Sequence, residues 1–312
     1  MSGAAERDAA FWLALLDVPG AGRATAWRVA DAAGRLGVAP AGLVEAAVAD
    51  LLAQGVDGNA AAHVAAARGR LREAEATVRR AREAGAEPVP WGDARYPDAL
   101  RACLGAAAPP LLFLRGALEL ISRPGAAIVG GRTPEPEAAR CARDCAAALV
   151  EAGAVIVSGG AKGIDTAAHE GALAAGGTTV VVLPAGILNL EASPPLRTAL
   201  DTGRVLAVSE FPPRAPWATP HAVTRNGTIS ALSRLLCLLA PRRQGGSVAT
   251  ARWSLASGKP VGYAFAESAR SLTEPSPLAF PLLGAGGILD RDALLDAWHG
   301  APDAPPAQPR LF

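Results

Sequence analysis

The sequence predicts an α/β protein, in which a Rossmann-like, doubly wound and mainly parallel sheet follows a helical N-terminal domain. Two observations predict it. From residue 126 onward, short apolar segments alternate with segments of helical periodicity, a pattern typical of parallel sheets. Residues 1–85, by contrast, carry their apolar residues at helical spacing. The expected strands are 126–129, 154–158, 179–183, 205–208, 235–240 and 260–265.

The chain divides by composition into four parts. Residues 1–85 are expected to form a helix-hairpin-helix-like domain, with a third helix over about 60–84. The proline-rich residues 86–124 predict an extended connector that packs on the core and supplies one or two edge strands. Residues 125–298 are expected to form the Rossmann-like domain, and 299–312 a proline-rich tail.

Overall charge and composition restrict the classes of function. Of 312 residues, 50% are hydrophobic and the net charge is +1, so any nucleic-acid-binding face must be local. The four cysteines form neither a CxxC pair nor a Cys/His cluster, so no metal is expected. The N-terminus lacks an apolar signal segment and the apolar runs are too short to span a bilayer, so we expect a cytoplasmic protein without a membrane partner.

A glycine-rich loop follows the first expected strand. Gly130, Gly131 and Arg132 stand there, before a helix expected to begin at Pro134. Glycines allow the backbone to approach a phosphate, the helix N-terminus supplies free N–H groups, and an arginine matches phosphate oxygens. A tight strand-to-helix turn without a ligand explains the glycines equally well.

A second loop of the same kind follows the next strand. It contains Gly159, Gly160, Lys162 and Gly163, and Lys162 is one of only two lysines in the chain. The loop matches neither a Walker A sequence nor GxGxxG, so we expect no nucleotide cofactor. Both loops belong to the carboxyl edge of the sheet, where open α/β sheets bind ligands, and we therefore predict a phosphate-binding site there.

Two further segments are expected at this edge. Residues 224–230 look like another helix start, from which Arg225 and Asn226 reach the same site. Gly245 and Gly246 favour close packing of a helix on the sheet.

An acid–base pair is also present in the sequence. Asp165 and His169 stand four residues apart on the helix after the second loop, so they can share a hydrogen bond. No nucleophile or metal-ligand set accompanies them, so we predict a structural network, no catalytic residue and no enzyme activity.

A second candidate phosphate site lies near the N-terminus, where residues 15–34 resemble a helix-hairpin-helix, a motif that holds DNA phosphates. Gly20 and Gly22 free backbone N–H groups for a phosphate, and Arg23 adds a charge. Many hairpins of this type only pack against a neighbour, so an auxiliary DNA contact and a purely structural role remain open.

Several motifs together resemble one known family. The stretches AIVGGRTPEP (127–136) and IVSGGAKGIDTAAHEGALAAGGTTVVVLPAGI (156–187) are similar to the two most characteristic segments of the DprA/Smf family of DNA-processing proteins. Other family-like segments follow in the same order. They are SEFPP (209–213), TRNGTISALS (224–233), GGSVATAR (245–252) and ASGKPV (256–261).

The resemblance implies a Rossmann-like homodimer that binds single-stranded DNA and hands it to the RecA recombinase. It implies that Arg132, Lys162 and Arg225 face the DNA, and that Gly131, Gly160 and Asn226 shape the pocket. The chain departs from the family at Gly227, where a second arginine is usual, and at residues 240–241, and within these 312 residues we expect no C-terminal winged helix.

Two other functions use a similar fold. One is a phosphoribohydrolase of the LOG type, but residues 183–187 lack the glutamate on which those enzymes depend. The other is a sensor for a nucleotide-derived ligand in the same pocket. Titration with mononucleotides and with an oligonucleotide distinguishes a sensor from a DNA-binding protein.

The last five residues resemble a peptide that binds the DNA-polymerase sliding clamp. Gln308 is expected to hydrogen-bond at the rim of the clamp pocket, and Leu311 and Phe312 to fill its apolar groove. Short motifs of this kind also occur by chance in frayed tails.

Overall fold

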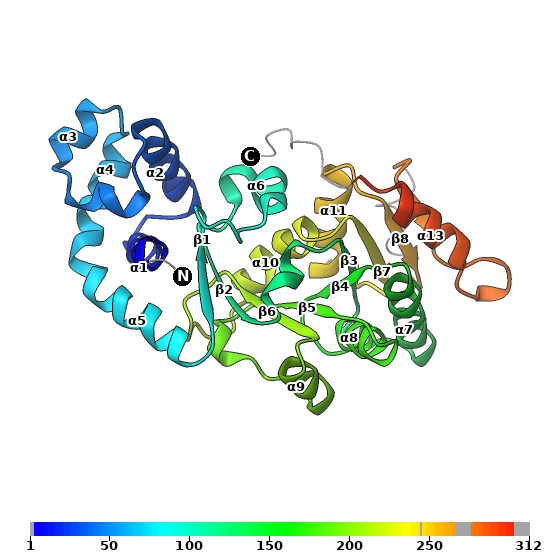
Figure 1. The fold of residues 1–312 in the computed structure, drawn as a ribbon. Coiled ribbons are helices and arrows are strands. Elements are labelled where there is room, and N and C mark those ends of the chain that lie inside the picture. Colours follow the sequence, from blue (N-terminus) through cyan, green and yellow to red (C-terminus); the bar gives the residue numbers. More distant parts are fainter. Residues whose placement is uncertain (1–2, 244, 266–275, 303–312) are drawn as a thin grey trace.

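The computed structural model describes residues 3–243, 245–265 and 276–302, and Figure 1 shows their arrangement. Helices and strands alternate from β3 to β8. The strands are β1 Glu87–Pro90, β2 Leu111–Gly116, β3 Gly125–Gly130, β4 Val155–Ser158, β5 Thr179–Val182, β6 Val205–Ser209, β7 Leu235–Leu239, β8 Val261–Ala264 and β9 Ala279–Pro281. The α-helices are α1 Gly3–Leu16, α2 Arg23–Leu36, α3 Val48–Ala53, α4 Gly58–Ala67, α5 Leu71–Glu83, α6 Asp98–Leu104, α7 Pro136–Glu151, α8 Ile164–Ala174, α9 Pro194–Asp201, α10 Thr219–Ala231, α11 Gly246–Ala256 and α13 Arg291–Gly300.

The strands form one sheet in the order β1-β2-β6-β5-β4-β3-β7-β8-β9. β1 and β2 pair antiparallel with each other, and β2 pairs antiparallel with β6. From β6 to β9 all pairs are parallel, as expected for a doubly wound sheet. The chain moves outward from β3 to β6 and then returns to the other side of β3 with β7. The order of strands therefore reverses between β3 and β7.

Helices cover both faces of this sheet. Alternate residues of β3 point to opposite faces: Ala126 and Ile128 join the core beneath α7 and α8, whereas Ala127 and Val129 join the core beneath α6, α10 and α11. β7 alternates in the same way. Strands buried on both faces explain the continuous apolar runs of the sequence.

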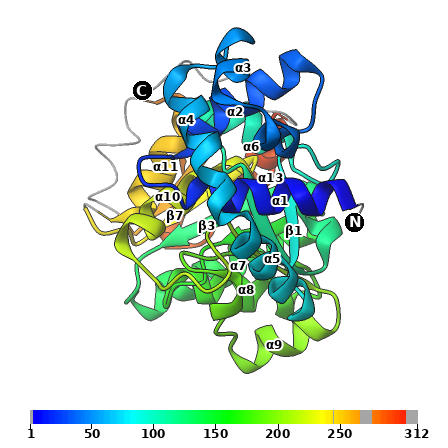
Figure 2. The ribbon, with the colours of Figure 1, turned by 90° about the vertical axis from the view of Figure 1, so that its left-hand side faces the viewer.

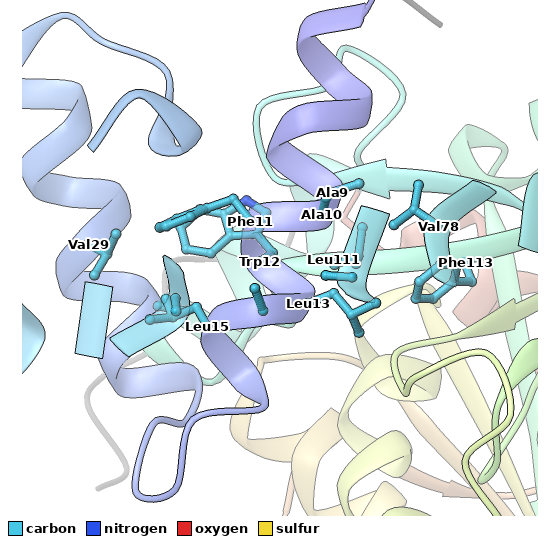
Figure 3. Packing of buried hydrophobic residues seen from close by; sticks show 14 of the residues in the cluster. Ala9, Ala10, Phe11, Trp12, Leu13, Leu15, Val29, Val78, Leu111 and Phe113 are labelled. Carbon is cyan, nitrogen blue, oxygen red and sulfur yellow. The ribbon is translucent and has the colours of Figure 1, made fainter. Parts of the chain in front are cut away.

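The N-terminal helices share a core with the sheet. α1 crosses beside the antiparallel end of the sheet, and α2 to α4 lie together at one end of the molecule (Figure 2). Figure 3 shows Phe11, Trp12 and Leu15 of α1 among these helices and Leu13 near Leu111 of β2. The cluster of buried residues that contains Phe11 and Trp12 continues through Leu111 into β5 and β6.

Several expected boundaries were wrong. The third N-terminal helix is divided into α4 and α5 by a short 3₁₀ segment, Arg68–Arg70. The connector contains the helix α6, and α7 begins at Pro136 rather than Pro134. α10 begins at Thr219 with Pro220 in its first turn, five residues before the expected start, because proline is well accommodated there.

Candidate functional site

A hollow of about 470 Å³ lies where the strand order reverses, at the carboxyl ends of β3 and β7. This is the position at which open α/β sheets bind their ligands. Its walls come from the loop after β3, from the start of α8, from α10 and its preceding loop, and from the start of α11. The lining residues are Val129, Gly130, Gly131, Arg132, Ala161, Asp165, Trp217, Thr219, Ala222, Val223, Arg225, Asn226, Arg242, Gly245, Gly246, Ser247 and Thr250.

The glycines of the two predicted loops pack the loops together. A Cβ atom on residue 130 would lie 1.9 Å from the carbonyl oxygen of Leu239, so this position requires glycine. The Ile164 N–H donates to the Gly131 carbonyl over 3.1 Å. Gly163 has a φ of +87°, and a Cβ there would lie 2.4 Å from the same Gly131 oxygen. These contacts support the turn-and-packing interpretation of Gly130, Gly131 and Gly163.

Arg225 lies against the second loop. It is buried in the middle of α10, so it does not stand at a helix start as the sequence suggested. Its guanidinium occupies the space above Gly159, where a Cβ would lie 1.8 Å from Nη1. Burial lowers the pKa of Arg225, and the carboxylates of Asp165 and Glu210 raise it. Arg225 therefore helps to form the floor of the hollow.

Asp165 holds the second loop from below. Its carboxylate accepts hydrogen bonds from the backbone N–H groups of Gly159 and Ala161, at 3.2 and 3.3 Å. Burial raises its pKa, whereas the charge of Arg225 and these hydrogen bonds lower it. Gly160, at φ +68°, has the left-handed backbone that this loop needs.

His169 bonds to the sheet. Its Nδ1 lies 2.7 Å from the hydroxyl of Thr179, and that hydroxyl donates to the Ile156 carbonyl. The hydroxyl proton is thus engaged, so Nδ1 carries the proton and donates to Thr179. Burial lowers the pKa of His169 to about 4. The pairing of His169 with Asp165 that the sequence suggested is replaced by this bond to β5.

Asn226 and Gly227 connect α10 to its neighbours. The Asn226 side chain donates to the Gly246 carbonyl over 3.1 Å and so joins α10 to the start of α11 at the hollow. A Cβ on residue 227 would lie 3.2 Å from Leu104 of α6 and 3.9 Å from Trp253 of α11. Position 227 therefore faces the helical packing, and glycine allows α10 to approach α6 closely.

Exposed cations surround the hollow. Arg132 and Arg242 line it and are exposed, and Lys162 is exposed next to the lining residue Ala161. Within residues 3–243, 245–265 and 276–302, no ion pair involves any of these three side chains. With Arg225, the lining holds three arginines and one carboxylate, that of Asp165, so the hollow suits an anion.

Two lining residues, Arg242 and Trp217, were not expected from the sequence. Arg242 follows β7 just as Arg132 follows β3, and this shared position after a buried strand was the available signal. Trp217 lies in the loop before α10 and is 54% exposed. The sequence could have indicated it only as one of six tryptophans, because it stands in a proline-rich segment without helical or strand periodicity.

The N-terminal hairpin has its arginine engaged inside the molecule. Gly20 makes the turn at φ +82° and Gly22 caps α2. Arg23 forms an ion pair with the buried carboxylate of Glu210 at 3.0 Å and donates to the Ala107 carbonyl over 2.7 Å. These contacts join α2 to the sheet and favour the structural interpretation of Arg23.

Three other expectations concern features outside this hollow. Gln308, Leu311 and Phe312 lie outside the described residues. In the described parts of the chain, histidine, cysteine and acidic side chains do not come together in a group that could hold a metal ion. Every helix among the described residues is too short or too polar to cross a membrane.

A known protein family matches this chain. The family described as DNA recombination-mediator protein A matches residues 88–275, more than half of the chain and the whole region that builds the hollow. The chain belongs to this family. The resemblance drawn from the sequence motifs is thereby confirmed.

Individual relatives are similar over part of their length. The chain is 35% identical over 156 residues to the DNA processing protein DprA of Streptococcus pneumoniae, and these cover 49% of this chain and 55% of the relative. It is 31% identical over 213 residues to the protein Smf of Escherichia coli, covering 63% and 54%. The chain thus spans about half the length of these relatives.

Solved structures agree on the fold. The structure of DprA from Streptococcus pneumoniae matches with a TM-score of 0.68 at 23% identity, over 92% of this chain and 97% of that chain. DNA processing protein A from Helicobacter pylori matches with a TM-score of 0.54 at 26% identity, over 64% of this chain and 93% of that chain. That structure was reported for the way in which the Helicobacter protein binds single-stranded DNA. The predicted Rossmann-like fold is confirmed.

Proposed function

We propose that this protein binds single-stranded DNA in the hollow between β3 and β7, protects it and hands it to the RecA recombinase during recombination and DNA uptake. One observation carries the proposal. Three arginines line a hollow at the carboxyl edge of the sheet, and the exposed pair, Arg132 and Arg242, has no ion-pair partner among the described residues. Unpaired guanidinium groups at such an edge suit phosphate oxygens.

Support also comes from the relatives. The Helicobacter pylori protein, which shares the fold and is 26% identical, is described by its binding of single-stranded DNA. The proposed DNA-facing residues are Arg132, Lys162 and Arg242 as phosphate contacts, with Arg225 forming the floor. The net charge of +1 agrees with a local site, because the arginines at the hollow are balanced by acidic residues elsewhere.

We also propose that the protein is not an enzyme. The titratable groups near the hollow hold the fold: Asp165 accepts bonds from its own loop, and His169 is bonded to Thr179. Neither is placed as a base beside a nucleophile. Nucleotide turnover or nuclease activity that is lost in a folded Asp165→Asn or His169→Gln variant would contradict this.

A nucleotide-derived small ligand is the second candidate occupant. Its support is the volume of the hollow, about 470 Å³, which lies in the range of small-molecule sites. A competition experiment with an oligonucleotide and a mononucleotide distinguishes a DNA-binding site from a small-ligand sensor. If the hollow serves DNA, an oligonucleotide displaces a bound mononucleotide at far lower concentration than the reverse; a sensor gives the opposite order.

The direct test is an electrophoretic mobility shift with single- and double-stranded oligonucleotides of the same sequence. We expect the single strand to bind more tightly and both to weaken with salt, because phosphate contacts release counterions. Equal binding of both, or preference for the duplex, would contradict the proposal.

The protein partners are part of the same proposal. For RecA, the test is the lag before RecA assembles on a single strand, which this protein is expected to shorten. For the homodimer, sedimentation equilibrium measures the mass.

For the sliding clamp, calorimetry compares a peptide of the last twelve residues with one carrying Leu311→Ala and Phe312→Ala. We expect a Kd on the order of micromolar for the native peptide only.

A further inference from the structure

Trp217 is an aromatic side chain that the fold does not bury. It lies between β6 and α10, lines the hollow and is 54% exposed. Exposed Val223 of α10 lines the same hollow. An indole left in water forgoes the stabilisation that burial of its apolar surface would give, so stability of the fold does not account for its position.

The loop that carries Trp217 is firmly held on both sides. The Ala215 carbonyl accepts hydrogen bonds from the Gly186 N–H at 2.8 Å and from the Asn189 side chain at 2.7 Å. On the other side, Nδ1 of His221 lies 3.2 Å from the Pro216 carbonyl. The His221 ring also stacks on Phe211, with ring centroids 4.0 Å apart and 21° between the planes. The backbone next to the indole is therefore fixed before any ligand arrives, which lowers the entropic cost of binding.

The surroundings of Trp217 indicate the chemistry of its ligand. Arg132 and Arg242 line the same hollow and supply positive charge, while the indole supplies an aromatic face. A ligand that satisfies both carries an anionic group and a flat aromatic group. A nucleotide of a single strand has both, and its base is free to leave its neighbours and stack on a side chain, unlike the bases of a duplex.

We propose that Trp217 is a stacking platform for one base of a single DNA strand whose neighbouring phosphates contact Arg132 and Arg242. This rests on the proposed function and adds the feature that selects single strands over duplexes. Because every base has an aromatic face, the platform is tolerant of sequence.

The experiment compares two strands and three proteins by fluorescence anisotropy. The strands are a labelled oligothymidylate and an abasic oligomer of equal length, which keeps the phosphates but lacks the bases. The proteins are the unmodified chain, Trp217→Ala and the matched control Trp27→Ala. Trp27 is also exposed, at 39%, but it lies on α2 against Trp91 and lines a different hollow.

We expect Trp217→Ala to weaken binding of oligothymidylate about tenfold, equivalent to ~1.4 kcal/mol. Its binding of the abasic strand should equal that of the unmodified chain, and Trp217→Phe should restore most of the affinity for oligothymidylate. Trp27→Ala should change neither affinity. Circular dichroism and the melting temperature show that each variant is folded.

Two results would overturn the platform while leaving the proposed function intact. One is a folded Trp217→Ala variant that binds oligothymidylate as tightly as the unmodified chain. The other is an equal loss of affinity for both strands, which would mean that the substitution acts on phosphate contacts. If the unmodified chain binds neither strand, the proposed function itself fails and the platform fails with it.

Discussion

At the scale of single residues, Arg225 is a charge placed where a charge is costly. It is 6% exposed, and burial lowers its pKa more than the carboxylates of Asp165 and Glu210 raise it. Removing it leaves the buried Asp165 without its main source of positive charge. We therefore expect Arg225→Ala to lower the free energy of unfolding by about 3 kcal/mol, because it leaves a buried carboxylate without nearby positive charge and empties the space above Gly159.

The comparison that checks this is chemical denaturation of Arg225→Ala beside Arg132→Ala. Arg132 is exposed, so its loss should change stability by less than ~0.5 kcal/mol. Arg225→Lys should not restore the native value, because an ammonium cannot reproduce a planar guanidinium above Gly159. Equal stability of the two alanine variants would show that Arg225 does not support the floor of the hollow.

His169 gives the fold a dependence on pH. Its pKa is about 4 in the folded chain and about 6.5 when exposed, so the unfolded chain binds the proton more readily. Its contribution to stability is therefore complete above pH 6.5 and is lost as the pH falls toward 4, by ~3 kcal/mol at most. Asp165, whose pKa is raised, acts in the opposite direction and is present in every variant.

Replacing His169 with glutamine should flatten this dependence. We expect the unfolding free energy of the native chain to fall more steeply between pH 6.5 and 4 than that of His169→Gln. Urea denaturation at several pH values measures the difference. Parallel curves for the two proteins would mean that His169 is not buried in its neutral form.

At the scale of elements, the loops after β3 and β4 depend on close backbone contact. Gly163 and Gly176 both have positive φ, +87° and +76°, but only Gly163 has backbone where a Cβ would go. Gly176→Ala should therefore cost only the strain of its backbone, about 1 kcal/mol. Gly163→Ala should cost several kcal/mol more, because the loop after β3 must move.

Thermal unfolding of the two variants makes this comparison, and the Gly163→Ala variant should also lose affinity for single strands. Similar melting temperatures for both would show that the two loops do not pack as described. Gly176 is the suitable control because it lies just after α8, the helix that Gly163 immediately precedes.

A buried ion pair joins α2 to the sheet. Arg23 pairs with the fully buried carboxylate of Glu210, to which Thr228 also donates over 2.7 Å. Arg23→Ala leaves this carboxylate short of a partner and should cost about 2 kcal/mol. Arg28→Ala removes an exposed ion pair between Arg28, also on α2, and Asp57 at the start of α4, and should cost much less than Arg23→Ala.

Arg23 is engaged internally, so we expect the folded Arg23→Ala variant to bind single-stranded DNA as tightly as the native chain. Anisotropy titration at a fixed salt concentration measures this. A clear loss of affinity would restore the hairpin as an auxiliary DNA contact.

Elements that depend on local residues could be predicted from the sequence, whereas contacts between distant segments could not. The buried strands β3, β4, β5 and β7 were predictable because their apolar runs are local signals. The start of α10 was not, because Pro220 is as compatible with a loop as with the first turn of a helix. The partners of Arg23 and His169 come from distant strands, and a single sequence does not reveal such long-range pairings.

At the scale of the whole molecule, the site was partly predictable for the same reason. The convergence of the loops after β3 and β4 follows from parallel topology alone, which places their carboxyl ends at one edge. The position of Arg225 was not predictable, because it depends on how α10 packs on the sheet. This packing places Arg225 against Gly159 of the loop after β4, and not at the exposed rim of the hollow. The contributions of Arg242 and Trp217 depend on the return of the chain to β7 beside β3.

The central claim is that phosphates bind at this edge, and salt dependence tests it most directly. The measurement is the anisotropy of a labelled single strand titrated at several salt concentrations with the native chain and with Arg132→Ala/Arg242→Ala. The logarithm of affinity should fall linearly with the logarithm of salt, with a slope of about −0.7 for each neutralised phosphate. The double variant should bind more weakly, and its slope should be shallower by about 1.4, because two phosphate contacts are lost. A folded double variant with the affinity and slope of the native chain would contradict the account.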